Sequence, residues 1–123
     1  MNAKRDPNVY LCDIRAAIRL IRRYTEAGED RFLSDTMVQD AVIRQISVIG
    51  EAAAKLPRDL RDKHPNVPWK KVTGMRNILI HDYAETDIPT VWTTVTEDLP
   101  RLQHAVERMI AQIEDSENAR NAA

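Results

Sequence analysis

Apolar residues recur every three or four positions along most of this chain, which is the spacing of one buried helix face. The pair Asp6-Pro7 predicts where the first helix starts, because Asp is a good N-cap and proline is tolerated at the first helical position. Gly28 is typical of a helix end. The apolar stripe between them comprises Leu11, Ile14, Ala17, Ile18, Leu20, Ile21 and Tyr24.

A second helix is predicted from Ser34-Asp35 to the residue before Pro57. Its apolar stripe comprises Val38, Val42, Ile46, Ile49, Ala53 and Leu56. Gly50 lies inside this helix, where glycine costs about 1 kcal/mol relative to alanine. Because residues 52–54 are all alanine, we expect a neighbouring helix to approach closely at this point.

The segment 57–68 contains three prolines and predicts a connector, with one short turn around Asp59–Lys63. A third helix is predicted to begin near Pro68 or Trp69 and to continue to about Tyr83.

A fourth helix is predicted after Asp87, a capping residue, with Pro89 in the first turn. Pro100 lies inside it and cannot donate to the carbonyl of Thr96, so we expect a kink or break there. We expect the ordered core to span about 7–115 and the tail from Ser116 to Ala123 to be frayed. The apolar stripe alternates strictly between spacings of three and four: Trp92, Val95, Leu99, Leu102, Val106, Met109 and Ile113. This stripe could be a seam for a partner, but bundle core is the favoured interpretation.

These patterns predict one all-α domain over residues 1–123, a bundle of four to five helices. The chain has only three glycines, and no segment has the alternation of a strand. No stretch approaches 18 apolar residues, and the N-terminus lacks the apolar core of a signal peptide. Cys12 is the single cysteine, so a disulfide within the chain is excluded. We expect Cys12 to be a core residue and the protein to be cytoplasmic.

Charge is unevenly distributed, although the net charge is only −1. Between Lys55 and Arg76 there are seven basic residues against two acidic ones, whereas 77–117 has nine acidic residues against two arginines. A phosphate backbone could use such a basic segment, but a solvated loop with no partner would have the same composition. The candidate RNA contacts are Arg58, Arg61, Lys63, Lys70 and Lys71.

The segment 76–83, Arg-Asn-Ile-Leu-Ile-His-Asp-Tyr, carries the most distinctive chemistry. Arg76 offers a planar fork of donors that matches phosphate, and His81 can take or give a proton near neutral pH. The alternative is a helix end with three solvated polar residues. His64 and His104 have no second ligand at helical spacing, so neither a metal site nor a cofactor is expected.

The pattern Arg-x4-His-x-Tyr, with Asn77 directly after the arginine, resembles the signature of HEPN-domain ribonucleases, in particular the HepT toxin family. The similarity extends from about residue 8 to residue 113. Further landmarks occur in the family order: Met37–Arg44, Ile49–Ala53, Val67–Trp69, Gly74–Asn77 and Asp98–Pro100.

The resemblance implies a HEPN-like homodimer that cleaves RNA without metal, as the toxin of a type VII-like toxin–antitoxin pair. It also implies a partner, an MntA-type nucleotidyltransferase antitoxin, which would silence the toxin by adenylylating Tyr83. Arg76 would then stabilise the phosphate, His81 would be general base or acid, and Asn77 would orient His81 or a phosphate oxygen.

Simple geometry agrees with a dimeric site. On an ideal α-helix Arg76 and His81 lie roughly 140° apart, whereas Arg76 and Tyr83 share one side. One chain therefore offers one imidazole set obliquely to its own arginine, and a two-fold dimer would supply two of each. The competing interpretations are a non-catalytic HEPN subunit that binds nucleotide and regulates a nucleotidyltransferase, and a plain helical dimerisation protein. The Arg76/His81 pair favours the ribonuclease over the scaffold.

Overall fold

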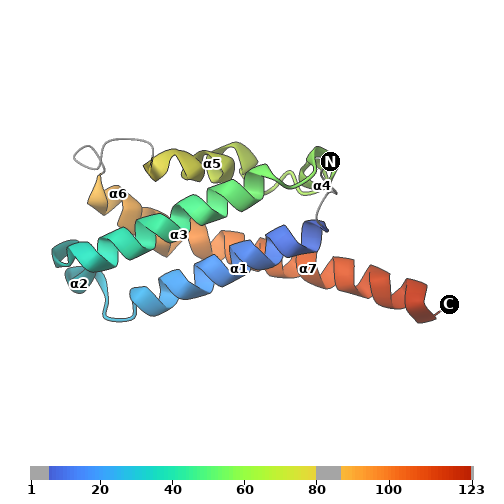
Figure 1. The fold of residues 1–123 in the computed structure, drawn as a ribbon, viewed down its shortest axis with the longest axis horizontal. Helices are drawn as coiled ribbons and strands as arrows, with labels where there is room; N and C mark the ends of the chain where they lie inside the picture. Colours follow the sequence, from blue (N-terminus) through green and yellow to red (C-terminus); the bar gives the residue numbers. More distant parts are fainter. Residues whose placement is uncertain (1–5, 80–86, 123) are drawn as a thin grey trace, which may run out of the picture.

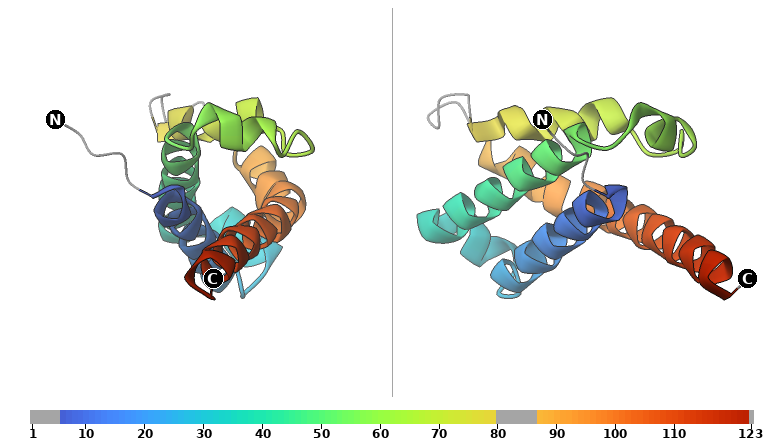
Figure 2. Two further views of the ribbon diagram at one scale, coloured as in Figure 1. Left: turned by 90° about the vertical axis from the view of Figure 1, so that its right-hand side faces the viewer. Right: turned by 45° about the vertical axis from the view of Figure 1, so that its right-hand side comes forward.

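The structure, a computed structural model, describes residues 6–79 and 87–122. Every regular element in these two ranges is a helix, so the predicted all-α class is confirmed (Figure 1). Helices α1 and α3 lie side by side, α7 packs beside α1, and the segment that begins with α5 lies over α3 (Figures 1 and 2). No helix among the described residues is long and apolar enough to cross a membrane.

Helix α1 spans Pro7–Tyr24 and begins as the sequence predicts. The carboxylate of Asp6 accepts a hydrogen bond of 2.9 Å from the Asn8 backbone N–H, and Pro7 occupies the first helical position. The side chains that face the core are Leu11, Ile14, Ala17, Ile18 and Ile21, all from the predicted stripe.

A short helix α2, Glu29–Ser34, follows α1 and was not predicted. Gly28 precedes it with φ of 93°, a left-handed conformation that favours glycine. Phe32 is fully buried, and its ring centroid lies 5.1 Å from that of Trp92. A helix of six residues with one buried side chain has no apolar periodicity, which is why the sequence pattern does not reveal it.

Helix α3 spans Thr36–Ala54, close to the predicted limits. Asp35 is its N-cap and accepts hydrogen bonds from the backbone N–H groups of Met37 and Val38. All of the predicted stripe is buried except Val38, which is half-buried against the core.

The connector contains helix α4, Arg58–Asp62, at the predicted short turn. The third helix differs from its prediction, because α5 spans only Trp69–Gly74 and continues as a 3₁₀ helix, η1, over Met75–Leu79. Gly74 has low helix propensity, and the chain tightens directly after it. The rest of the predicted helix, up to Tyr83, lies outside the described residues.

Helix α6 spans Ile88–Thr93, and its N-cap is Asp87, as predicted. A π-helical turn η3, Thr94–Asp98, separates it from α7, which spans Leu99–Ala122. The irregularity predicted at Pro100, a kink or break, takes the form of this π-helical turn directly upstream, and the chain stays helical through it, because proline cannot donate into a regular α-helical turn. The structure keeps α7 helical past Ser116, where fraying was predicted, and its C-terminal part projects beyond the other helices (Figures 1 and 2).

Candidate active site

The backbone of Arg76 rests directly on helix α3 at Gly50. A Cβ atom built on Gly50 would lie 2.7 Å from the carbonyl carbon of Met75 and 2.8 Å from the Cα of Arg76. It would be closer still to the backbone nitrogen of Arg76. No side chain fits in this space, so glycine is required for η1 to cross α3 here. The close helix approach predicted at Gly50 is confirmed, and its partner is the segment that carries the candidate catalytic arginine.

The side chains of Arg76 and Asn77 are exposed although the backbone at Arg76 is held against α3. This arrangement fixes the backbone position from which the Arg76 side chain extends, and it leaves the guanidinium donors accessible to a ligand. The other two motif residues, His81 and Tyr83, lie outside the described residues. The proposed grouping of Arg76 with His81 and Tyr83 therefore stays a prediction.

The start of the motif has a different helical geometry from the one predicted. The angle of roughly 140° between Arg76 and His81 is that of an α-helix with about 100° per residue, whereas Arg76 and Asn77 lie in a 3₁₀ helix with about 120° per residue. Residues three apart then lie above one another on the 3₁₀ segment. The angle between Arg76 and His81 stays a prediction, because His81 lies outside the described residues.

A cavity of about 340 Å³ opens beside Asn77. Its walls come from the end of α5 with the start of η1, from α3 and from the α6–η3 region. Ile46, Val91 and Met75 give it an apolar side, and Lys71 contributes an ammonium group. The candidate motif therefore borders a hollow of mixed polarity.

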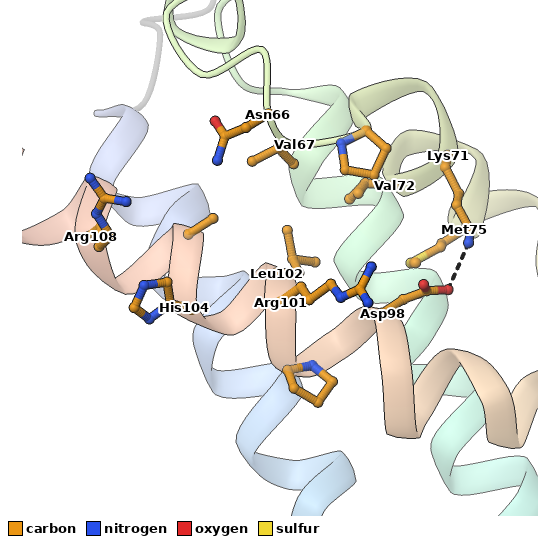
Figure 3. A pocket seen from close by; sticks show the side chains of 13 residues that line it. Asn66, Val67, Lys71, Val72, Met75, Asp98, Arg101, Leu102, His104 and Arg108 are labelled. Carbon is orange, nitrogen blue, oxygen red and sulfur yellow. Dashed lines mark ion pairs between the residues drawn. The ribbon is translucent and has the colours of Figure 1, made fainter.

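A larger cavity of about 710 Å³ lies between α5 and α7, next to the first (Figure 3). Lys71 and Met75 line both cavities. Arg101, His104 and Arg108 follow one another along α7 on one side, and the residues before and within α5 form the other.

The candidate RNA-binding residues have different surroundings. Arg58, Lys63 and Lys70 are exposed, and Arg61 is half-buried with a buried Nε atom that has no hydrogen-bond partner. Lys71 forms an ion pair of 2.8 Å with Asp98, which joins α5 to the π-helical turn (Figure 3). A carboxylate therefore offsets part of the charge of Lys71.

The sequence analysis did not select three basic side chains of the larger cavity. In the sequence, Arg101 and Arg108 are two arginines within an acidic segment, and His104 has no second metal ligand at helical spacing. Their spacing of three and four residues places all three on one side of α7. The spacing alone indicates that these three side chains share one face of a helix. It does not distinguish a binding surface from a solvated face opposite an apolar stripe.

Neither Cys12 nor any cluster of metal-ligating side chains forms a second candidate site among the described residues. Cys12 is half-buried against the core, and the Arg15 guanidinium lies 3.7 Å from its sulfur. Among residues 6–79 and 87–122, no three His, Cys, Asp or Glu side chains are grouped so that they could hold a metal ion.

Comparisons with known proteins find similar sequences over most of the chain. The sequence description of the family "Ribonuclease HepT-like" matches residues 14–109. The protein named "Probable ribonuclease HepT" from Thermococcus cleftensis is 42% identical over 107 residues, which cover 86% of this chain and 97% of the relative. "Putative RNase MJ1380" from Methanocaldococcus jannaschii is 40% identical over 106 residues, 85% of this chain and 97% of the relative.

One relative is longer. "Gamma-glutamylcyclotransferase and putative RNase MJ0434" from the same archaeon is 37% identical over 116 residues, which cover 94% of this chain but only 52% of that protein. This chain therefore spans about half the length of that relative. No solved structure matches the chain at a significant level. The family match and the identities over nearly the whole chain show that this protein belongs to the HepT-like family of ribonucleases.

Proposed function

We propose that this protein is an endoribonuclease toxin whose catalytic site is formed by Arg76 and His81 from two copies of the chain. The observation that carries the proposal is the position of Arg76: its backbone packs against Gly50, and its side chain is exposed. An exposed guanidinium on a fixed backbone is suited to hold a phosphate that changes charge during a reaction. Membership of a ribonuclease family makes RNA the expected source of that phosphate.

The proposed reaction uses RNA and the side chains of Arg76, Asn77 and His81 from two copies of the chain. One His81 removes the proton from a ribose 2′-hydroxyl, whose oxygen attacks the adjacent phosphorus. The bond from phosphorus to the 5′-oxygen breaks, and the second His81 donates a proton to that leaving oxygen. Arg76 stabilises the charge that builds up on the phosphate, and Asn77 orients His81 or a phosphate oxygen. The products are a 2′,3′-cyclic phosphate and a 5′-hydroxyl.

The reaction requires two protonation roles, and each chain has one His81. A two-fold axis that brings the two motifs together supplies a base, an acid and two guanidinium groups in one cleft. We therefore propose a homodimer, and a solution mass of twice 14.1 kDa is expected at micromolar concentration. A monomer that cleaves RNA at full rate would contradict the composite site.

The test is RNA cleavage by purified protein in excess chelator. Arg76→Ala should lower kcat by about 10²–10³-fold, the effect of removing one donor that stabilises a transition state. His81→Ala should abolish cleavage. Arg23→Ala is the matched control, because Arg23 is exposed in the last turn of α1 and lies outside the motif. Cleavage that is lost with chelator and restored by Mg²⁺ would contradict the proposed mechanism.

We further propose that a cognate MntA-type nucleotidyltransferase silences the toxin by adenylylating Tyr83. An AMP group attached near Arg76 would bring a phosphate and a bulky base to the site that binds RNA. After co-expression with the transferase, the intact mass should rise by one or more AMP units, and Tyr83→Phe should gain none while remaining an active ribonuclease. If the wild-type dimer binds nucleotide but never cleaves RNA, the protein is a regulatory subunit of the transferase instead.

A further inference from the structure

Three cavities of the described structure are joined by the residues they share. The cavity beside Asn77 shares Lys71 and Met75 with the large cavity between α5 and α7. The large cavity shares Asn66, Ala105 and Arg108 with a third, of about 380 Å³, that also contacts Lys63 and His64. We refer to this row of three neighbouring cavities as the α5–α7 groove. Figure 3 shows the side chains that line the cavity between α5 and α7.

The rim of this groove is cationic although the protein as a whole is slightly acidic. Lys63, Lys71, Arg101 and Arg108 line it against one carboxylate, that of Asp98. His64 and His104 add imidazole groups. Arg101 and Arg108 are the only Lys or Arg residues of the acidic segment 77–117, and both face the basic segment across the groove. The fold thus gathers positive charge that is separated along the sequence.

The floor of the groove is apolar. Val67, Val72 and Leu102 are buried there, and Pro68 and Pro100 add further apolar surface. A cationic rim suits the phosphates of a single-stranded nucleic acid. The apolar floor offers van der Waals contact to bases or riboses, without stacking, because no Phe, Tyr or Trp is among the described residues that line the three cavities. Arg101 and Arg108 lie two helical turns apart, about 10 Å along the axis of α7, so they can contact different phosphates of one strand.

We infer that the α5–α7 groove binds the RNA strand beyond the cleavage site and that Arg101 and Arg108 are its principal phosphate contacts. The inference rests on the proposed function only in taking RNA as the substrate. Charge complementarity favours this occupant over a protein partner with a neutral surface, and the cavity that borders Asn77 of the motif is a neighbour of the large one, with Lys71 and Met75 lining both.

The experiment measures binding without cleavage. The probe is a fluorescent single-stranded oligonucleotide of about 12 nucleotides whose 2′-hydroxyls are methylated, a length within the range of single-strand binding sites. It lacks the nucleophile of the proposed reaction, so its affinity reports binding without cleavage, and the contribution of the groove is the difference between the groove variant and the control. The groove variant is Arg101→Gln with Arg108→Gln, because glutamine keeps helix propensity and removes charge. The control is Arg23→Gln with Arg120→Gln, two exposed positions outside the groove with the same loss of charge.

The groove variant should bind roughly tenfold more weakly at low salt, and its plot of log affinity against log salt should be shallower by about 1.4, as expected for two lost phosphate contacts. The control should bind like wild type. Equal affinities for the two variants would overturn the inference. So would RNA affinity that is unchanged while the groove variant loses the nucleotidyltransferase or dissociates into monomers, because the groove would then bind protein.

The outcome is independent of the proposed chemistry. Wild-type protein that binds the methylated probe through the groove but never cleaves unmodified RNA would refute the proposed catalytic site and leave the groove assigned. Protein that cleaves RNA with equal probe binding by the groove and control variants would refute the groove and leave the catalytic site.

Discussion

The segment formed by α5 and η1 has two sides that are packed in opposite ways. On one side η1 meets α3 backbone to backbone, so that even one methyl group on Gly50 has no room. On the other side α5 faces α7 across a cavity of about 710 Å³, bridged by the ion pair of Lys71 with Asp98. Close packing places Arg76 relative to the core, whereas the open side leaves space for a ligand. A candidate site of this kind needs both properties, and the fold assigns them to opposite faces of one short segment.

The largest expected change in the free energy of unfolding comes from shortening one buried side chain on the close-packed side of α5–η1 and one on its open side. Ile49→Ala, next to Gly50 on α3, should lower the free energy of unfolding by an amount near the top of the range of about 2–5 kcal/mol for such changes. Leu102→Ala should fall near the bottom, because Leu102 already borders an open cavity. Urea unfolding at one protein concentration measures both. Equal losses would show that the two sides are packed alike.

The next effect concerns the glycine itself. Gly50→Ala should cost about 1–3 kcal/mol of stability through overpacking, and it should reduce RNA cleavage because the backbone of Arg76 must move. Gly74→Ala is the matched control: nothing lies within 4 Å of its added Cβ, so it should be neutral or stabilise by up to about 1 kcal/mol. If Gly50→Ala is as stable and active as wild type, the close crossing does not position the arginine.

A smaller effect is expected at the bridge across the open side. The side chain of Lys71 is 59% exposed and that of Asp98 is 27% exposed, so water screens their attraction. A double-mutant cycle with Lys71→Gln and Asp98→Asn should give a coupling of at most about 1 kcal/mol that decreases with added salt. A larger coupling that is insensitive to salt would show that water does not screen this pair, despite its partial exposure.

The smallest effect lies away from both sides, at the cap of α3. The Arg31 side chain and the backbone N–H groups of Val38 and Met37 donate to Asp35, and they hold the pKa of that carboxyl below its usual value of 3.8. The folded state thus favours the charged form, so this stabilisation is complete above that pH and is lost as pH falls through the folded pKa.

Two substitutions at this cap separate its components. Asp35→Asn keeps an oxygen that can cap the helix but has no titratable group. The loss of stability that wild type shows at acid pH through this carboxyl should therefore be absent in Asp35→Asn. Asp35→Ala should in addition destabilise the protein at neutral pH. Thermal unfolding between pH 3 and pH 7 distinguishes them, and identical profiles for wild type and Asp35→Asn would exclude the charge as the cause.

The sequence predicts one side of this comparison better than the other. The small residue at Gly50, with alanines after it, indicates a close helix approach, and the period of the apolar stripes predicts which faces are buried. It does not predict η1, because the choice between α and 3₁₀ geometry depends on how the chain packs against α3. The groove is also missed, because Arg101 and Arg108 meet the basic segment only through tertiary folding. Local patterns thus predict buried faces, whereas a surface built from distant segments needs the fold.

The π-helical turn at Thr94–Asp98 determines the rotational phase of the last helix. Such a turn acts as a one-residue insertion into a helix, and each residue of an α-helix turns the chain by about 100°. The buried side chains of α7 favour one rotation of this helix, and that rotation also points its arginines toward α5. Deleting one residue of the turn would set this rotation against the one that α6 imposes by about 100°, so the buried face of α6 and the cationic side of α7 could no longer both be in place.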